Sequence, residues 1–288
     1  MDDFREKLIA LMHYPGITWN AVLDYLIKDS SLQLKPQYIQ QNLFSSTKHS
    51  TLLSPTSLQT GTMIEQIRQY EQNGIKVITI LDENYPSLLK EIYQPPWVLF
   101  AKGDISLLRK EPKLAVVGSR QATQYGKSAI NVMFPQLVEK GVVIISGLAA
   151  GIDTLAHECA MKNGGHTIAV IAGGLAHIYP KKNAELAKEM METQLIVSEY
   201  PPTTKPQRWH FPARNRIISG MSKGTFIIEA KRKSGSLITA NYAVNEGREV
   251  FSLPGSIFNP FSMGTNDLIQ QGAKLVTSSE DILEELRL

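Results

Sequence analysis

Basic and aromatic residues gather in one segment of the chain, residues 205–233, which reads KPQRWHFPARNRIISGMSKGTFIIEAKRK. The segment holds eight Lys or Arg residues and one acid, Glu229, so its formal charge is +7. The whole chain of 288 residues carries +3, so the other 259 residues sum to −4. Clustered cations neutralise phosphates, and aromatic rings offer stacking surfaces to unpaired bases. The segment therefore favours a nucleic-acid contact, with a solvated basic face over buried aromatic rings as the alternative.

Three arginines of this segment are candidate phosphate ligands: Arg208, Arg214 and Arg216. Arg214 and Arg216 follow Phe211-Pro212, and the pattern places them in the first turn of a helix. A cation in the first turn opposes the helix dipole. We therefore expect the fold to gain nothing locally from these two side chains, which favours a ligand-facing role. Phe211 or a neighbouring aromatic ring is the candidate for base stacking.

Glycine- and serine-rich loops follow several short apolar runs. They are Gly118-Ser119-Arg120, Ser146-Gly147, Gly173-Gly174 with Lys181 soon after, and residues 234–240 (SGSLITA) just beyond Lys231 and Lys233. Glycine lets backbone N–H groups approach a ligand closely, and a helix N-terminus favours an anion. Taken together, the loops predict a phosphate-binding edge, although a tight turn alone would explain any one of these glycines.

Other chemistries find less support. No GxxxxGK[ST] motif is present, which excludes a P-loop NTPase, and no HExxH or other metal spacing occurs. The run after Gly118 ends in Ser146 rather than in an acid for a ribose hydroxyl, which disfavours a nicotinamide-dependent oxidoreductase. His157 and Cys159 lie two residues apart and would not face each other on a helix. Asp153 is expected to stabilise a helix start. We predict no catalytic residue, no cofactor and no metal.

Eight short apolar runs predict the strands that position these loops. They span 75–81, 97–101, 113–118, 142–147, 167–173, 194–199, 225–230 and 249–255. Most are unbroken rather than alternating, as expected of strands covered on both faces. Between 113 and 246 they alternate with stretches long enough for helices, which indicates crossover connections and a mainly parallel sheet. Ligands bind such a sheet at the carboxyl ends of its strands, where the loops would meet.

The ends of the chain read as helical. Apolar residues at three- and four-residue spacing predict short helices in the first 44 residues, and residues 279–288 predict one more amphipathic helix. Residues 45–61 read as a Ser/Thr-rich linker before a helix at 63–72. We therefore expect a small helical domain with its linker over 1–60, and an α/β domain with helices on both faces of the sheet over 61–288.

Composition places the chain in an ordinary folded class. Apolar residues make up 43% of it and charged residues 20%. One cysteine excludes a disulfide framework and fits a reducing, cytoplasmic compartment. No apolar run reaches the roughly 18 residues that a membrane span needs. The first 15 residues lack the basic start and long apolar stretch of a secretory signal.

Seven motifs occur in order along the chain: VVGSR (116–120), SGLAAGID (146–153), GGLAHIYPKKN (173–183), SEYPP (198–202), HFPARNRIISG (210–220), EAKRKSGSLITA (229–240) and VFSLPGS (250–256). Together they closely resemble the DprA/Smf family, the DNA-processing proteins of natural transformation. The resemblance covers about residues 75–278. It implies an extended Rossmann-like fold that binds single-stranded DNA without sequence specificity, forms a homodimer and loads the recombinase RecA. The helical N-terminus resembles the sterile-alpha-motif-like domain of some members.

The resemblance also implies roles for individual residues. The DNA groove would be lined by Arg120, Lys181, Arg208, Arg214 and Arg216. The dimer contact would lie within residues 256–272, with Ile257, Phe258, Phe261 and Leu268 as apolar contacts, although half of that stretch could be core. The alternative is an enzyme, a nucleotide hydrolase similar to the lysine-decarboxylase-like phosphoribohydrolases. Those are expected to show PGGxGTxxE at a helix start, where this chain has KSGSLITAN without the Glu.

Overall fold

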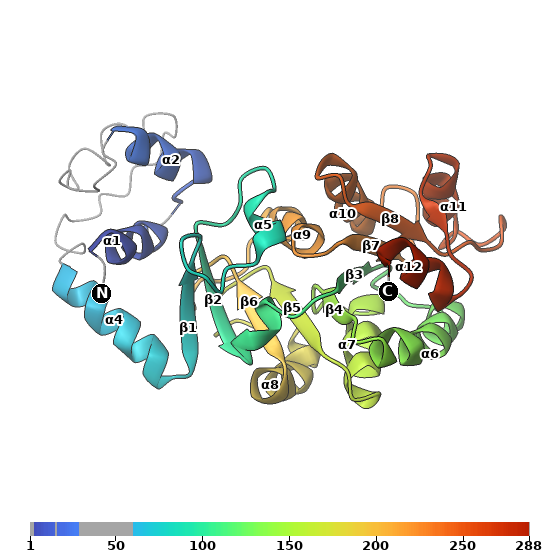
Figure 1. Cartoon of the computed structure of the whole chain (residues 1–288), viewed down its shortest axis with the longest axis horizontal. Helices are drawn as coiled ribbons and strands as arrows, with labels where there is room; N and C mark the ends of the chain where they lie inside the picture. The colour runs from blue at the N-terminus through green and yellow to red at the C-terminus, as the bar shows by residue number, and fades with distance from the viewer. Residues whose placement is uncertain (1–2, 15, 29–59, 288) are drawn as a thin grey trace.

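A nine-stranded, mainly parallel sheet forms the centre of the molecule (Figure 1). The computed structural model describes residues 3–14, 16–28 and 60–287. The strands are β1 (Ile75–Thr79), β2 (Val98–Gly103), β3 (Lys113–Val117), β4 (Val143–Ser146), β5 (Thr167–Ile171), β6 (Leu195–Ser198), β7 (Gly224–Ile227), β8 (Glu249–Ser252) and β9 (Lys274–Leu275). Their spatial order is β1-β2-β6-β5-β4-β3-β7-β8-β9. β2 pairs antiparallel with β1 and β6, and the other pairs are parallel.

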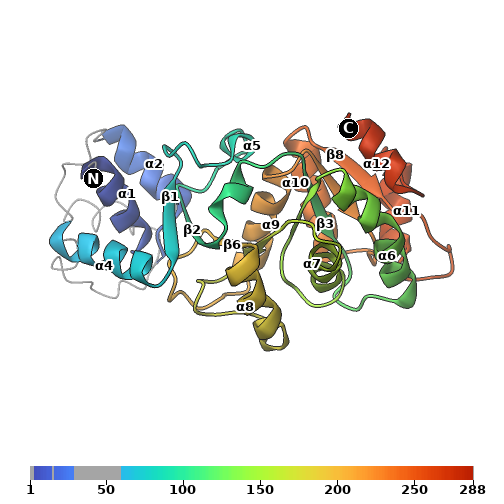
Figure 2. The ribbon, with the colours of Figure 1, turned by 60° about the horizontal axis from the view of Figure 1, so that its bottom comes forward.

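Helices cover both faces of this sheet (Figures 1 and 2). The longer ones are α1 (Asp3–Met12), α2 (Trp19–Lys28), α4 (Thr60–Gln72), α6 (Gln124–Glu139), α7 (Ile152–Lys162), α8 (Ala184–Thr193), α9 (His210–Gly220) and α10 (Gly235–Asn245). The shorter ones are α5 (Ser87–Lys90), α11 (Met263–Gln270), α12 (Ser279–Leu286) and the 3₁₀ helices η2 (Ile105–Leu108) and η3 (Lys181–Asn183). Within these described ranges, no helix combines the length and apolarity needed to cross a membrane.

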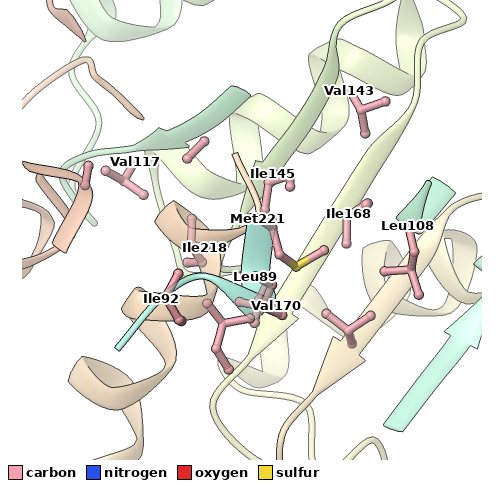
Figure 3. Close-up of a cluster of buried hydrophobic side chains, with 14 of the residues drawn as sticks. Leu89, Ile92, Leu108, Val117, Val143, Ile145, Ile168, Val170, Ile218 and Met221 are labelled. Carbon is pink, nitrogen blue, oxygen red and sulfur yellow. The ribbon is translucent and has the colours of Figure 1, made fainter. Parts of the chain in front are cut away.

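The two faces of the strands belong to different cores. Val143 and Ile145 of β4 point into a cluster that α5, α9 and α10 cover, as Figure 3 shows for Ile218 of α9 and for Met221, the residue after α9. Ile144, between them in sequence, belongs to a second cluster with α6, α7 and α12. Apolar side chains are needed on both faces, which explains why the strand sequences are unbroken apolar runs.

The predicted fold class is confirmed, and all eight predicted strands are present. β9 was not predicted because two residues are too short for a recognisable apolar run. The predicted linker extends too far, since α4 begins at Thr60 rather than at residue 63. Residues 45–59 of that linker, and the predicted helical residues 29–44, lie outside the described residues. The sequence places the start of this helix three residues too late because Thr60-Gly61 contributes no apolar periodicity.

The N-terminal helices pack against the antiparallel edge of the sheet. Leu8 and Val22 share a core with Val77 of β1 and Phe100 of β2. The rings of Trp19 and Trp97 stack with their centroids 5.1 Å apart. The described part of the N-terminal segment therefore shares a hydrophobic core with the sheet. A domain boundary near residue 60 stays a prediction.

Candidate nucleic-acid interface

A cleft of about 800 Å³ opens at the carboxyl ends of the central strands. Its walls come from the loop after β3 (Gly118 to Gln121), the first half of α9, the loop after β7 with the start of α10 (Lys231 to Ser236), and Phe261. A smaller hollow of about 80 Å³ adjoins it, and Gly147, Gly173 and Phe211 are among its lining residues. The parallel sheet thus brings together loops that are more than 100 residues apart in sequence, as the motif pattern predicted.

Positive charge dominates the lining of this cleft. Its cations are Arg120, Arg208, Arg214, Lys231, Arg232 and Lys233, and its acid is Asp153. Arg232 is engaged by Asp267, with 2.8 Å between Nε and Oδ2. Four others are exposed and form no ion pair within the described part of the chain: Arg120, Arg208, Lys231 and Lys233. These four cations are available to a polyanion.

Two aromatic rings of the cleft lie next to cations. The Arg120 guanidinium lies 5.6 Å from the ring centroid of Phe211, which meets Tyr179 edge to face. Elsewhere in the lining, the Lys231 ammonium lies 4.4 Å from the ring centroid of Phe261. Each pair combines a stacking surface for a base with a charge for its phosphate.

Arg214 is a buried structural residue. Helix α9 begins at His210, so the expected first-turn position of Arg214 and Arg216 is wrong: both lie at least one turn further along. The Arg214 side chain is 5% exposed, and its Nη1 donates to the carbonyl oxygens of Gly147, at 2.6 Å, and Val170. Burial lowers the pKa of Arg214 to about 10, against the opposing effect of nearby Asp153. The expectation that the fold gains nothing from this cation is therefore also wrong.

Asp153 also stabilises the loop that contains Gly147. Its Oδ2 accepts hydrogen bonds from the backbone N–H groups of Gly147 and Ala149, at 3.2 and 3.3 Å. Burial raises the pKa of Asp153, while Arg214 and these hydrogen bonds lower it. A Cβ on residue 147 would lie 2.6 Å from the Arg214 guanidinium, so a larger residue there would displace that group from its carbonyl partners. The predicted helix-start role of Asp153 is confirmed, since it lies in the first turn of α7.

Arg216 also serves the fold, through an ion pair. Its Nη2 lies 2.5 Å from Oε1 of Glu199, and the two side chains are only 12% and 11% exposed. Burial raises the pKa of Glu199, and Arg216 opposes that rise. Arg216 is absent from the lining of both the cleft and the adjoining hollow. The structure therefore separates it from the four available cations.

Comparison with known proteins decides the family. Residues 76–287 match the family model described as DNA recombination-mediator protein A. The chain belongs to this DprA/Smf family. It is 54% identical over 217 residues to the DNA processing protein DprA of Bacillus subtilis (strain 168), covering 75% of this chain and 73% of that one. It is 45% identical to Protein Smf of Escherichia coli (strain K12), covering 75% of this chain and 58% of that one.

Solved structures of DprA/Smf proteins share the fold. The X-ray structure of DprA from Streptococcus pneumoniae matches with a TM-score of 0.80 at 40% identity, and 99% of each chain is covered. DNA processing protein A from Helicobacter pylori matches with a TM-score of 0.67 at 32% identity, over 74% of this chain and 95% of that one. The Helicobacter structure concerns a single-stranded DNA binding mode of that protein.

The remaining residues predicted at the phosphate-binding edge differ in whether they face the cleft. Gly118 and Ser119 line the cleft, as expected. Ser146 is fully buried, and its hydroxyl donates to the Val116 carbonyl at 2.6 Å, so it faces the interior rather than a ligand. Gly174 is packed against the Pro201 carbonyl, where a Cβ would come within 2.1 Å. Lys181 is exposed on η3 but outside the cleft lining.

Glu229, His157 and Cys159 occupy positions inside the fold. Glu229 accepts hydrogen bonds from the backbone N–H and the hydroxyl of Thr123, which caps α6. His157 is buried, with 2.6 Å between its Nδ1 and Oγ1 of Thr167, and Cys159 is buried one half-turn on. In the described ranges, no group of three or more His, Cys, Asp or Glu side chains could hold a metal ion.

The four residues expected at a dimer contact lie in three different places. Ile257 and Phe258 are 73% and 87% exposed. Phe261 lies in the cleft wall beneath Lys231, and Leu268 is 9% exposed within the core cluster under α10. Sequence reasoning missed the cleft position of Phe261 and that of Tyr179. The aromatic residue within IYPKKN was the available signal for Tyr179.

Proposed function

We propose that this chain binds single-stranded DNA in the cleft at the carboxyl ends of the strands, without regard to sequence. The observation that carries the proposal is the pairing of aromatic rings with available cations, Phe211 with Arg120 and Phe261 with Lys231. Stacking is tolerant of base identity because every base has a π-face. The single-stranded DNA binding mode of the Helicobacter pylori relative supports the same function here.

Phosphates would follow the Gly118–Arg120 loop and the Lys231–Lys233 segment, with bases turned toward Phe211. Arg208, at the entrance to α9, would add a further phosphate contact. The buried Arg214 would act as a positioning residue, because it holds the Gly147 and Val170 carbonyls behind the cleft floor. Arg216 is left out of this proposed groove.

We further propose that the bound strand is handed to the RecA recombinase during natural transformation, in the cytoplasm, by a homodimer. Membership of the DprA/Smf family supports this role. Ile257 and Phe258 are the proposed dimer contacts, because two neighbouring large apolar side chains are strongly exposed there. Leu268 is left out because it packs in the core.

Binding without catalysis is proposed because Asp153 and Glu229 are already engaged in hydrogen bonds within the fold. Asp153 accepts hydrogen bonds from two backbone N–H groups of the preceding loop, and Glu229 accepts one from the Thr123 N–H. Release of free base from nucleoside monophosphates would overturn this part of the proposal and favour the phosphoribohydrolase alternative.

The decisive experiment is a salt titration of binding to labelled single-stranded and duplex DNA. Four phosphate contacts predict a slope of log affinity against log salt of about −2.8, from ~0.7 per phosphate on single strands. Arg120→Ala should make the slope shallower by about 0.7. Lys223→Ala is the matched control, because Lys223 is exposed at the opposite, amino end of β7. A slope near zero, or equal affinity for both DNA forms, would refute the proposal.

A further inference from the structure

A second positively charged pocket lies beside the cleft. Its volume is about 410 Å³, and its cations are Arg120, Lys127 and Lys182. They come from three elements: the loop after β3, the first turn of α6, and η3. None of the residues that line this pocket is acidic, and none is aromatic. Its chemistry therefore suits an anion that offers no ring for stacking.

Hydrogen bonds brace the backbone beneath both lysines. Thr123 caps α6 by accepting from the Tyr125 N–H at 3.2 Å, and its own N–H donates to Glu229 at 2.9 Å. On the other side, the buried Asn183 ties η3 to its surroundings. Its Nδ2 donates to the Leu148 carbonyl at 2.8 Å and to the Thr154 hydroxyl at 2.9 Å. Lys127 and Lys182 thus project from fixed positions.

The second pocket is continuous with the cleft through Arg120, which lines both. The loops that form the floor between them are in direct contact, since the Ile152 N–H donates to the Ser119 carbonyl at 3.0 Å. At Gly151 a Cβ would come within 2.2 Å of the same carbonyl. Arg120 and Gln121 line both depressions, so a DNA strand that leaves the cleft at Arg120 would next meet the second pocket.

We propose that the second pocket holds the sugar-phosphate backbone of the same DNA strand as it leaves the cleft. The proposal rests on the proposed function and extends it. Bases would stack in the cleft, where the aromatic rings are, and only phosphates would be held by Lys127 and Lys182. The second pocket would then lengthen the DNA segment that the protein covers, with no preference for sequence.

The test is the double variant Lys127→Gln/Lys182→Gln, measured on thymidine oligonucleotides of about 6 and about 20 nucleotides, one near the lower end of common site sizes and one above their upper end. On the long oligonucleotide, two lost phosphate contacts should make the salt slope shallower by about 1.4. On the short one, the slope should equal that of the unaltered protein. Both lysines are exposed, and the variant's unfolding temperature is measured alongside.

The matched control is Lys140→Gln/Lys162→Gln, which removes the same charge. Lys140 and Lys162 are exposed at the far ends of α6 and α7, away from the pocket. A control that changes the long-oligonucleotide slope as much as the test variant would overturn the proposal. Unchanged binding of the test variant at both lengths, or equal losses at both, would also overturn it. Failure of the unaltered protein to bind either oligonucleotide would instead refute the proposed function itself.

Discussion

Arg214 should matter for stability far more than its position in a basic segment suggests. Replacing it by methionine keeps an extended side chain but removes the donor to the Gly147 and Val170 carbonyls. It also leaves Asp153, 5% exposed, without its nearby cation. Removing one partner from a buried pair of charges lowers the free energy of unfolding by about 3–5 kcal/mol. We take about 3 kcal/mol here, because Asp153 keeps its two backbone N–H partners.

Thermal unfolding followed by circular dichroism checks this magnitude. For a chain of 288 residues, an unfolding entropy of about 2.1 cal/mol/K per residue turns about 3 kcal/mol into a fall in Tm of roughly 5 °C. Arg208→Met is the control, because Arg208 is exposed at the cleft and forms no ion pair among the described residues. It should leave Tm within about 1 °C, since surface substitutions usually stay within ~0.5 kcal/mol. It should instead make the DNA salt slope shallower by about 0.7.

A double-mutant cycle with Asp153→Asn tests the coupling itself. The amide can still accept from the Gly147 N–H but carries no charge that Arg214 must balance. The double variant should therefore be less destabilised than the sum of the two single variants, by about 0.5–3 kcal/mol. An unchanged Tm for Arg214→Met together with a shallower salt slope would refute the reasoning, because Arg214 would then be contacting phosphate.

Three further predictions follow from other side chains. Phe211→Leu should weaken binding to single-stranded DNA by about 1–3 kcal/mol without changing the salt slope, and a changed slope would contradict a stacking role. Arg216→Met should cost about 3 kcal/mol of unfolding free energy, because it strands the buried Glu199, yet leave DNA affinity unchanged in a filter-binding assay. Burial and nearby Arg214 lower the pKa of His157 to about 3, so below about pH 6.5 the unfolded chain takes up a proton that the folded chain excludes. Urea unfolding at pH 7 and 5 should therefore show a loss of about 2 kcal/mol from this group, absent in His157→Gln, and an equal loss in the variant would count against it.

The sheet and its functional edge could be predicted from the sequence because they depend on local patterns. Unbroken apolar runs followed by glycine-rich loops indicate buried parallel strands and place the loops at one edge. The structure confirms the eight strands and brings Gly118, Arg120, Phe211 and Lys231 into one cleft. These predictions hold in the folded protein because apolar side chains are buried wherever the chain folds, so the apolar runs mark the buried strands and the polar, glycine-rich stretches mark the loops.

The roles of individual cations could not be predicted, because a cation's partner is set by tertiary contacts. Of the eight basic residues in 205–233, Arg214 is bonded to a carbonyl 67 residues away, Arg216 is paired with Glu199, and Arg232 with Asp267. Lys223 lies at the opposite edge of the sheet, at the start of β7. The segment's +7 therefore overstates the charge that a ligand would meet.

Phe261 shows the same limit for an aromatic residue. Its turn-rich surroundings are compatible equally with a dimer contact, a core position or a ligand site. Hydrogen bonds from the Ala230 N–H to the Phe261 carbonyl, at 2.7 Å, and from the Gly264 N–H to the Ala230 carbonyl, at 2.8 Å, hold its loop at the end of β7, where its ring lies beneath Lys231. The sequence by itself determined the family, the sheet and the edge where binding residues gather. Tertiary structure decided which cations are bonded within the fold and which remain available to a ligand. The reason is that each cation's partner is a residue distant in sequence, which only folding brings within hydrogen-bond distance.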